Sequence, residues 1–595
     1  MTERKARAKT ERTAEARAKR KAEAKACVGT YNFCTMKSFC TPLSLLPLVV
    51  SCLIAAPLGA QSMSGMSMSS EGGALATPAQ MQERLGTVNF PVSCAAGTQA
   101  AFDRGVALVH DFWYEEAGKQ FDRIVKADPT CAMAHWGVAM SSFHQIWGRP
   151  SPGMMAAGLK ETQAAQALPV KTEREKDYIA TLAVFFNPGK EEYPARIAAY
   201  SDAAGKLYAK YPDDVDAGAF YALSLLAAED PDDTSLGHEH KAMAVLTPLF
   251  AKSPNNPGVV HYIVHACDNP AMAAEGLVAA DHYGEIAQSG PHAFHMPGHI
   301  YSRLGLWTKD EESQLGSIAA SQAAEKRGES GIMDEPHSYD FLIYAYLQSG
   351  QDLKAKKALE ASAAPLDTIV GMKGYMAEMV PYYRLKLPGF YAVEMHDWKA
   401  AAAMEPAPGM KPDVATEAYW FRVIGDGHLK NAAGARADLA KYDALIAEIK
   451  KSDKAYEVEG INATMNRDEM LAWVAYAEGK PDEAVKAMRA AADIQDKVGQ
   501  GEVDIPAREM LADMLLDFGK PKEALAEYEV ALKLSPNRLN GLFNAGRAAE
   551  AVGDKTVAAG YYAALLKSTD GGAGSSRPEF AHAKSFVAGT EQAAK

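Results

Sequence analysis

Residues 505–536 read IPAREMLADMLLDFGKPKEALAEYEVALKLSP, and this stretch decides the fold. Counted from Ile505, small residues stand at positions 8 and 20, an aromatic residue at position 24 and a proline at position 32. Small residues let two helices approach closely, the aromatic ring fills the space between them, and proline ends a helix because it has no backbone N–H to donate. The stretch therefore predicts a helical hairpin.

The same frame occurs twice more. It begins again 34 residues later at Leu539, with Gly546, Ala558 and Tyr562 at positions 8, 20 and 24. Near the other end it begins at Thr98, with Gly105, Ala117, Phe121 and Pro129 at positions 8, 20, 24 and 32. A fixed period of this length is typical of stacked helical repeats. Residues 98–148 and 465–568 resemble the tetratricopeptide repeat family.

The rest of the chain is also predicted to be helical. Alanine-rich segments dominate and alternating runs of Val, Ile and Thr are scarce, which favours helix over strand. We predict an all-α fold, a superhelical solenoid of tetratricopeptide-like hairpins. Its expected parts are an N-terminal extension with a signal peptide at 1–60, a disordered linker at 61–80, a tetratricopeptide-like array with a histidine-rich groove at 81–360, an irregular helical region at 361–464, C-terminal repeats at 465–568 and a tail at 569–595.

An export signal is expected within residues 36–60. Met36 and Lys37 give a basic start, residues 43–56 are apolar, and Leu-Gly-Ala ending at Ala60 suits signal-peptide cleavage. The apolar run is shorter than the roughly 20 residues of a membrane-spanning helix. We therefore expect translation to begin at Met36 and the product to be periplasmic or secreted, with no stable membrane span. Lipoprotein processing at Cys52, which ends the sequence VVSC, is the alternative.

Charge argues against nucleic-acid partners. The formal net charge is −13, although the first 25 residues are basic. The remainder is more acidic than the total, so it should repel nucleic acid and anionic lipid.

The cysteines predict one disulfide in the exported protein. Cleavage after Ala60 leaves three cysteines, Cys94, Cys131 and Cys267. Cys94 and Cys131 flank the same predicted hairpin, and an oxidising compartment would let them pair. Cys267 would be the odd thiol, expected as a small buried hydrophobe.

Residues 256–307 hold six of the fifteen histidines, at positions 261, 265, 282, 292, 295 and 299. Two pairs of these histidines are four residues apart, so on a helix the members of each pair share a face. A carboxylate follows the first pair three residues later. Neutral imidazoles with a carboxylate suit Zn, Fe or Cu, so the stretch predicts a transition-metal site. Its expected ligands are His261, His265, His295, His299 and Asp268.

Two details narrow that prediction. Tyr262 stands where a zinc protease carries its glutamate base, so a protease of that type is excluded. Pro297 should interrupt the helix between His295 and His299, which makes the second pair less certain in geometry. Any one histidine at a helix contact is usually a hydrogen-bonded structural residue, so the prediction depends on all four converging.

The resemblance to tetratricopeptide repeats also implies a concave groove lined by particular first-helix positions. His110 and His144 fall at position 13, His295 and His337 at position 2, and His299 at position 6. A protein or peptide partner is expected in this groove. The residues expected to line it are His110, His144, His292, His337 and Tyr262.

The sequence phrases HYIVHACDNP, HAFHMPGHIYSRLGLW, FDRGVALVHDFWYEEA and CAMAHWGVAM resemble a group of exported bacterial tetratricopeptide proteins. That resemblance runs from Val88 onward and implies no particular reaction. A binding scaffold with a histidine cluster is the favoured function, because no nucleophile elbow, paired-carboxylate signature or nucleotide loop is visible in the sequence. The alternative is a metal-dependent hydrolase or oxidoreductase, with Tyr262, Asp268, His337 and Glu335 as acid–base candidates.

Overall fold

The computed structural model describes residues 75–77, 79–147, 149–189, 192–230, 232–370, 372, 375–452, 454–498 and 503–593. The predicted start at Met36, the signal peptide, Cys52 and most of the predicted linker lie outside these residues. The chain divides into two compact units, Met1–Ser69 and Ser70–Lys595, and the second is described here. Its described residues form helices and turns without a β-strand, as the all-α prediction requires.

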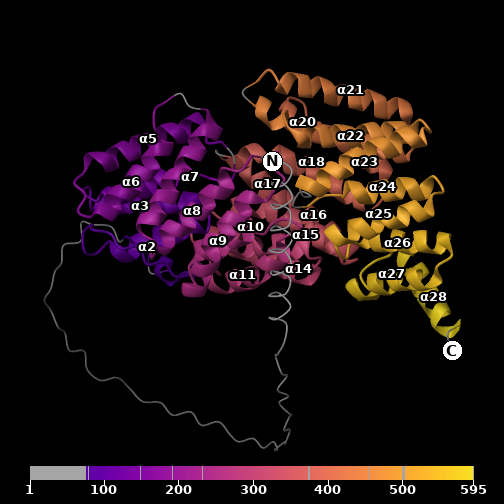
Figure 1. Cartoon of the computed structure of the whole chain (residues 1–595), viewed down its shortest axis with the longest axis horizontal. Helices are drawn as coiled ribbons and strands as arrows, with labels where there is room; N and C mark the ends of the chain where they lie inside the picture. The colour runs from indigo at the N-terminus through magenta and orange to yellow at the C-terminus, as the bar shows by residue number, and fades with distance from the viewer. Residues whose placement is uncertain are drawn as a thin grey trace, which may run out of the picture. The chain divides into compact units, whose positions relative to one another are not determined.

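The N-terminal helices, indigo to magenta in Figure 1, follow one another as packed pairs. A short 3-10 helix precedes them. These elements are η1 (Gln80–Gln82), α2 (Gln99–His110), α3 (Tyr114–Ala127), α4 (Ala132–Met140), α5 (Pro152–Ala167), α6 (Glu173–Phe185), α7 (Tyr193–Lys210), α8 (Val215–Ala227) and α9 (Gly237–Lys252).

The small residues of the repeat frame have a steric role in this array. The ring of Phe121 on α3 is completely buried between α2 and α4. A Cβ atom added at Gly105 would lie 2.6 Å from Cζ of Phe121, and one added at Gly137 would lie 2.3 Å from its Cδ1. Glycine is needed because the ring occupies the space that any other side chain would fill.

The central helices are short where prolines interrupt them. Pro291 and Pro297 each occupy the first position of a helix, where the missing N–H costs nothing. The elements are α10 (Pro257–Ala266), α11 (Ala273–Ile286), α12 (Pro291–His295), α13 (Pro297–Arg303), α14 (Trp307–Lys326), η2 (Ile332–Asp334), α15 (Glu335–Gln348), α16 (Asp352–Ala361), α17 (Ala363–Ile369), α18 (Tyr375–Glu394) and α19 (Trp398–Ala402).

The C-terminal helices, orange to yellow in Figure 1, again pack in chain order. Residues 361–464, expected to be irregular, include two 17- and 18-residue helices that pack together, and the expected tail contains a helix. The elements are α20 (Pro412–His428), α21 (Ala432–Ile449), η3 (Ala455–Val458), α22 (Ile461–Ala477), α23 (Pro481–Val498), α24 (Ala507–Asp517), α25 (Pro521–Leu534), α26 (Leu539–Val552), α27 (Lys555–Ser568), η4 (Asp570–Gly572) and α28 (Pro578–Ala593).

A buried arginine joins the C-terminal repeats to the central helices. The side chain of Arg538, 1% exposed, donates to Oε1 of Glu394 at 2.7 Å and to Oε2 of Glu509 at 2.9 Å. It also donates to the hydroxyl of Tyr344 on α15 at 2.6 Å. Since a buried guanidinium is stable only when paired, these contacts fix α26 against α15 and α18.

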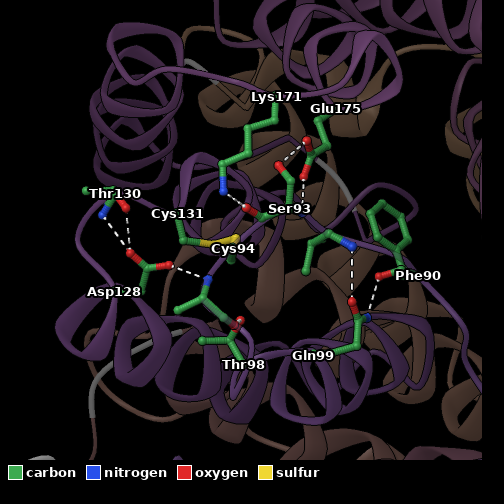
Figure 2. Close-up of a disulfide and its surroundings, with 12 residues drawn as sticks. Phe90, Ser93, Cys94, Thr98, Gln99, Asp128, Thr130, Cys131, Lys171 and Glu175 are labelled. Carbon is green, nitrogen blue, oxygen red and sulfur yellow. Dashed lines mark hydrogen bonds between the residues drawn. A yellow bond between two sulfur atoms is a disulfide. The ribbon is translucent and has the colours of Figure 1, made fainter.

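The disulfide lies at the base of the first hairpin. Cys94, ahead of α2, is bonded to Cys131, which caps the N-terminus of α4 (Figure 2). Asp128 reinforces the same point, because its Oδ2 accepts from the amide of Ala95 at 2.8 Å. Cys267 is a buried free thiol.

None of the helices in the described part of the chain is both long and apolar enough to cross a lipid bilayer.

Candidate metal centre

Six histidines from four helices gather in the interior of the central region. α10 carries His261 and His265, and α12 carries His292 and His295. His299 lies on α13 and His337 on α15. In two groups of three, the potential ligand nitrogens all lie within 4.8 Å of one another, and these groups are His261, His265 and His292, and His295, His299 and His337. We call the first group the α10 triad and the second the α13 triad.

Local sequence places α10 and α12 at defined starting points. The side chain of Asn256 accepts from the amide of Val259 at 3.1 Å and so caps α10, whose first residue is Pro257. Pro297 ends α12 and begins α13, as the sequence predicted, but Met296 keeps a right-handed helical backbone between them. Because the direction of the chain barely changes there, His295 and His299 still share one face.

The α13 triad is held by hydrogen bonds on its outer side. Nδ1 of His295 lies 2.7 Å from Oε1 of Gln314, and Nδ1 of His299 lies 2.8 Å from Oδ2 of Asp268. Nε2 of Gln314 donates to Asp310 at 2.9 Å, so its Oε1 is the atom that faces His295. An amide oxygen and a carboxylate can only accept, so each Nδ1 carries the ring proton.

A consequence follows for the inner side of these two rings. The Nε2 atoms of His295 and His299 lie 2.9 Å apart. With the protons on Nδ1, both Nε2 atoms present a lone pair, and two lone pairs repel at that distance. A cation shared by the two nitrogens removes the repulsion, and the third ligand of the group, His337, lies alongside with its ring centroid 4.4 Å from that of His295.

Asp268 supports His299 and is not one of the grouped ligands. Its second oxygen accepts from Nε of Arg303 at 2.9 Å. Burial would raise the pKa of Asp268, but Arg303 and His299 hold that pKa well below its usual range. The carboxylate therefore stays ionised. A carboxylate that accepts from the far nitrogen of an imidazole fixes the orientation of the ring and raises its basicity toward a metal.

The α10 triad has a similar construction. Nδ1 of His261 lies 2.6 Å from the backbone oxygen of His110, so that nitrogen is the donor and Nε2 carries the lone pair. Nε2 of His261 and Nε2 of His292 are buried, and neither has a hydrogen-bond partner among the described residues. Burying a polar atom without a partner costs about 1–3 kcal/mol, so such atoms need an explanation.

An aromatic residue in a strained conformation forms one wall of the α10 triad. Phe112, in the turn between α2 and α3, has a φ of 55°, in the left-handed region that bulky side chains avoid. Its ring centroid lies 4.3 Å from that of His261 and 5.4 Å from those of His265 and His292. Strain of this kind persists where the surrounding structure requires the side chain in one place.

The surroundings keep these imidazoles neutral. Burial lowers the pKa values of His261, His292 and His337 well below their usual range, and neighbouring histidines lower them further. The rings of His261, His295 and His299 are at most 3% exposed. Neutral imidazole is the form that binds Zn, Cu, Fe and Ni, so the protonation state suits a transition metal.

The residues predicted to line an open groove are instead mostly interior. His110 and Tyr262 are completely buried, and His292 is 6% exposed. Nδ1 of His110 contacts the Tyr262 hydroxyl at 2.9 Å, and its Nε2 contacts Asp216 at 3.0 Å. This differs from the groove expectation because α10 packs directly against α2. That contact covers the face on which those side chains lie.

His144 is half-buried at the edge of the cluster. Its ring stacks on Tyr114 with centroids 4.1 Å apart, and burial lowers its pKa to about 4. It belongs to neither triad. The structure thus separates the four histidines predicted as one site into two pairs, and completes each pair with a histidine that the sequence had assigned to the groove, His292 or His337.

Several supporting residues were not predicted. Gln314, Arg303 and Phe112 carry no metal-ligand signature in the sequence, and only their contacts reveal them. The Asx-type cap at Asn256 before a histidine helix was the one visible signal for how α10 is positioned. Cys94, Asp128 and Cys131 also lie close enough together for a metal, but the two sulfurs are bonded to each other, which removes them as thiolate ligands.

Residues 469–538 and 509–574 match the tetratricopeptide repeat family. The chain is a tetratricopeptide repeat protein. The matched residues contain the frames that begin at Ile505 and Leu539, so that prediction is confirmed. The histidine triads of this tetratricopeptide repeat protein lie outside the matched residues, so the family match does not account for them.

A crystal structure of a tetratricopeptide repeat protein from Parabacteroides merdae is similar to part of this chain. The sequences are 15% identical, the match covers 51% of this chain and 99% of the other, and the TM-score is 0.27. No curated protein matches the sequence.

Proposed function

We propose that this tetratricopeptide repeat protein is an exported binding scaffold that holds a transition-metal ion at His295, His299 and His337. The observation that carries the metal proposal is the 2.9 Å approach of two Nε2 atoms whose rings donate outward through Nδ1. Three imidazoles at about 2.0–2.1 Å are a common ligand set for a bound transition metal. Zn, Fe and Cu all accept it.

The scaffold part of the proposal rests on the repeats. Tetratricopeptide repeats stack into extended surfaces that bind protein partners. The repeats at 469–574 lie away in sequence from the triads, so partner binding and metal binding can be measured separately. We expect a protein or peptide partner at these repeats.

Export is supported by the disulfide. Disulfides form and persist outside the reducing cytosol, and Cys94 is bonded to Cys131. We propose cleavage after Ala60. N-terminal sequencing of the native product tests this: a start at Gln61 is expected, a lipid-modified Cys52 would show an anchored protein instead, and an intact Met1 would end the export proposal.

Metal analysis tests the site. The purified mature protein is stripped with a chelator, reloaded with Zn, Fe(II) or Cu and measured by elemental analysis. We expect stoichiometric binding by the wild type and by a control variant, His240→Ala with His582→Ala, which removes two exposed histidines outside the triads. His295→Ala with His299→Ala should lose the ion of the α13 triad. A wild type that stays free of metal after reloading with every ion would overturn the proposal.

A metal-dependent enzyme is the second candidate, because three protein ligands leave a coordination position for water or substrate. Glu335 lies two residues before the ligand His337, and burial raises its pKa to about 7, a value suited to acid–base work. Hydrolysis of activated esters and uptake of dioxygen are the assays. Turnover that needs the metal and disappears in the His295→Ala, His299→Ala variant would favour the enzyme.

A further inference from the structure

The α10 triad is a second set of metal-type ligands that the proposed site does not use. Nε2 of His261 and Nε2 of His292 are buried and have no hydrogen-bond partner among the described residues. Together with His265, their ligand atoms lie within 4.8 Å of one another. A buried polar atom that faces other lone pairs, with no donor beside it, is an arrangement that a bound cation would explain.

The ring of His261 is fixed in the orientation that a ligand needs. Its Nδ1 donates to the backbone oxygen of His110, and Tyr283 stacks on it with centroids 5.1 Å apart. Phe112 closes the other side at 4.3 Å. Because the ring cannot turn, its Nε2 lone pair stays directed toward His265 and His292, whose ring centroids lie 4.7 and 5.1 Å away.

The two triads are neighbours. His292 belongs to one and His295 to the other, yet both lie on the five-residue helix α12, three positions apart, with ring centroids separated by 5.8 Å. A charge on His299 of the α13 triad also lowers the pKa of His261 and of His292 in the α10 triad. An ion in one triad would therefore lie close to an ion in the other.

We infer that His261, His265 and His292 bind a second metal ion and that the two triads form one dinuclear centre of six imidazoles. This inference rests on the proposed function, since it requires the α13 triad to hold its own ion. The ligand geometry supports one ion for each triad, because each supplies three nitrogens and shares none with the other.

Copper is the metal we expect in both positions. All six ligands are neutral imidazoles, which suit Cu and Zn, whereas a non-haem iron site would include a carboxylate ligand. Two adjacent divalent ions would bring four positive charges into a buried space, and two Cu(I) ions bring half of that charge. Asp268 lies against His299, and Asp334 lies 3.9 Å from Nδ1 of His292, which leaves few anions nearby to offset more.

Counting copper ions tests the inference. The mature protein is loaded anaerobically with Cu(I), passed through a desalting column and measured for copper per chain. We expect two ions in the wild type and in the His240→Ala, His582→Ala control. The variant His261→Ala with His292→Ala should keep one ion, and so should His295→Ala with His299→Ala. The combination of all four substitutions should keep none.

A second measurement on the wild type avoids any dependence on how the variants fold. After oxidation to Cu(II), two ions about 4 Å apart, the spacing of known two-metal centres, would couple magnetically and suppress the mononuclear electron paramagnetic resonance signal. X-ray absorption should show metal–metal scattering at a similar distance. Each single-triad variant that folds, as judged by circular dichroism, should regain the mononuclear signal.

The outcomes separate this inference from the proposal beneath it. No bound copper in the wild type would overturn both. One copper per chain, lost in the His295→Ala, His299→Ala variant and kept when His261 and His292 are replaced, would overturn the dinuclear centre alone. Two ions that give independent mononuclear signals would show two separate sites and would also overturn it.

Discussion

Removing the Cys94–Cys131 disulfide should weaken the first hairpin selectively. The bond closes a loop with a sequence separation of 37 that contains all of α2 and α3 (Figure 2). The chain-entropy relation for a loop of that length gives about 4 kcal/mol of stabilisation. The same loop carries Phe112, the wall of the α10 triad, so the loss bears on the candidate metal centre as well.

Hydrogen exchange is the suitable assay, because repeat arrays open in parts and a single unfolding energy would not describe them. In the variant Cys94→Ser with Cys131→Ser, amides of α2 and α3 should exchange up to about a thousandfold faster, since each 1.4 kcal/mol is a factor of ten. The amide of Ala95 still donates to Asp128 in the variant, so the full factor is an upper bound. Amides of α24 to α27 should not change.

Reductant is the control. Added to the wild type, it should reproduce the exchange of the variant, and added to the variant, it should change nothing. Unchanged protection in α2 and α3 after either treatment would refute the reasoning, and so would an equal loss along the whole chain.

Three further changes have defined outcomes. Asp268→Asn should weaken metal binding about 10–100-fold in competition with a chromophoric chelator, because it removes the carboxylate that orients His299; unchanged affinity would contradict that role. Gly137→Ala should lower stability by about 1–3 kcal/mol, since its Cβ would lie 2.3 Å from the ring of Phe121, whereas Gly118→Ala, with 3.6 Å of clearance, should raise it by up to about 1 kcal/mol. Equal thermal midpoints for the two variants would count against the packing argument. Burial and the charge of Glu509 raise the pKa of Asp513 to about 8, so the folded protein binds the proton more tightly and its stability should fall as pH rises from about 4 to about 8. Asp513→Asn should remove that fall in the thermal midpoint, and an identical pH profile in the variant would exclude Asp513 as its source.

The repeat frame was predictable because its information is local. Gly105 and Phe121 occupy positions set by contacts within one hairpin, and such contacts recur at a fixed period along the sequence. The break at Pro297 was also predictable, because it follows from the covalent structure of proline. What the sequence could not show there is that Met296 stays helical and keeps His295 and His299 together.

The composition of the candidate site was predicted only in part. His261, His265, His295 and His299 stand out by their spacing, and they do lie in the interior cluster. His292 and His337 complete the triads through contacts between different helices, and no spacing rule within one helix could assign them. Asp268 was expected as a ligand, yet the structure places it behind His299, where Arg303 pairs with it.

The sequence by itself therefore determined the helical repeats, the region rich in histidines and the two cysteines that could pair. Those features depend on periodicity and composition, which a linear chain displays directly. Only the tertiary structure decided that α10 packs against α2 and buries His110 and Tyr262, and that six imidazoles divide into two triads. The reason is physical: ligand sets and buried lone pairs arise where helices distant in sequence meet, and those meetings are set by the packing of the whole core.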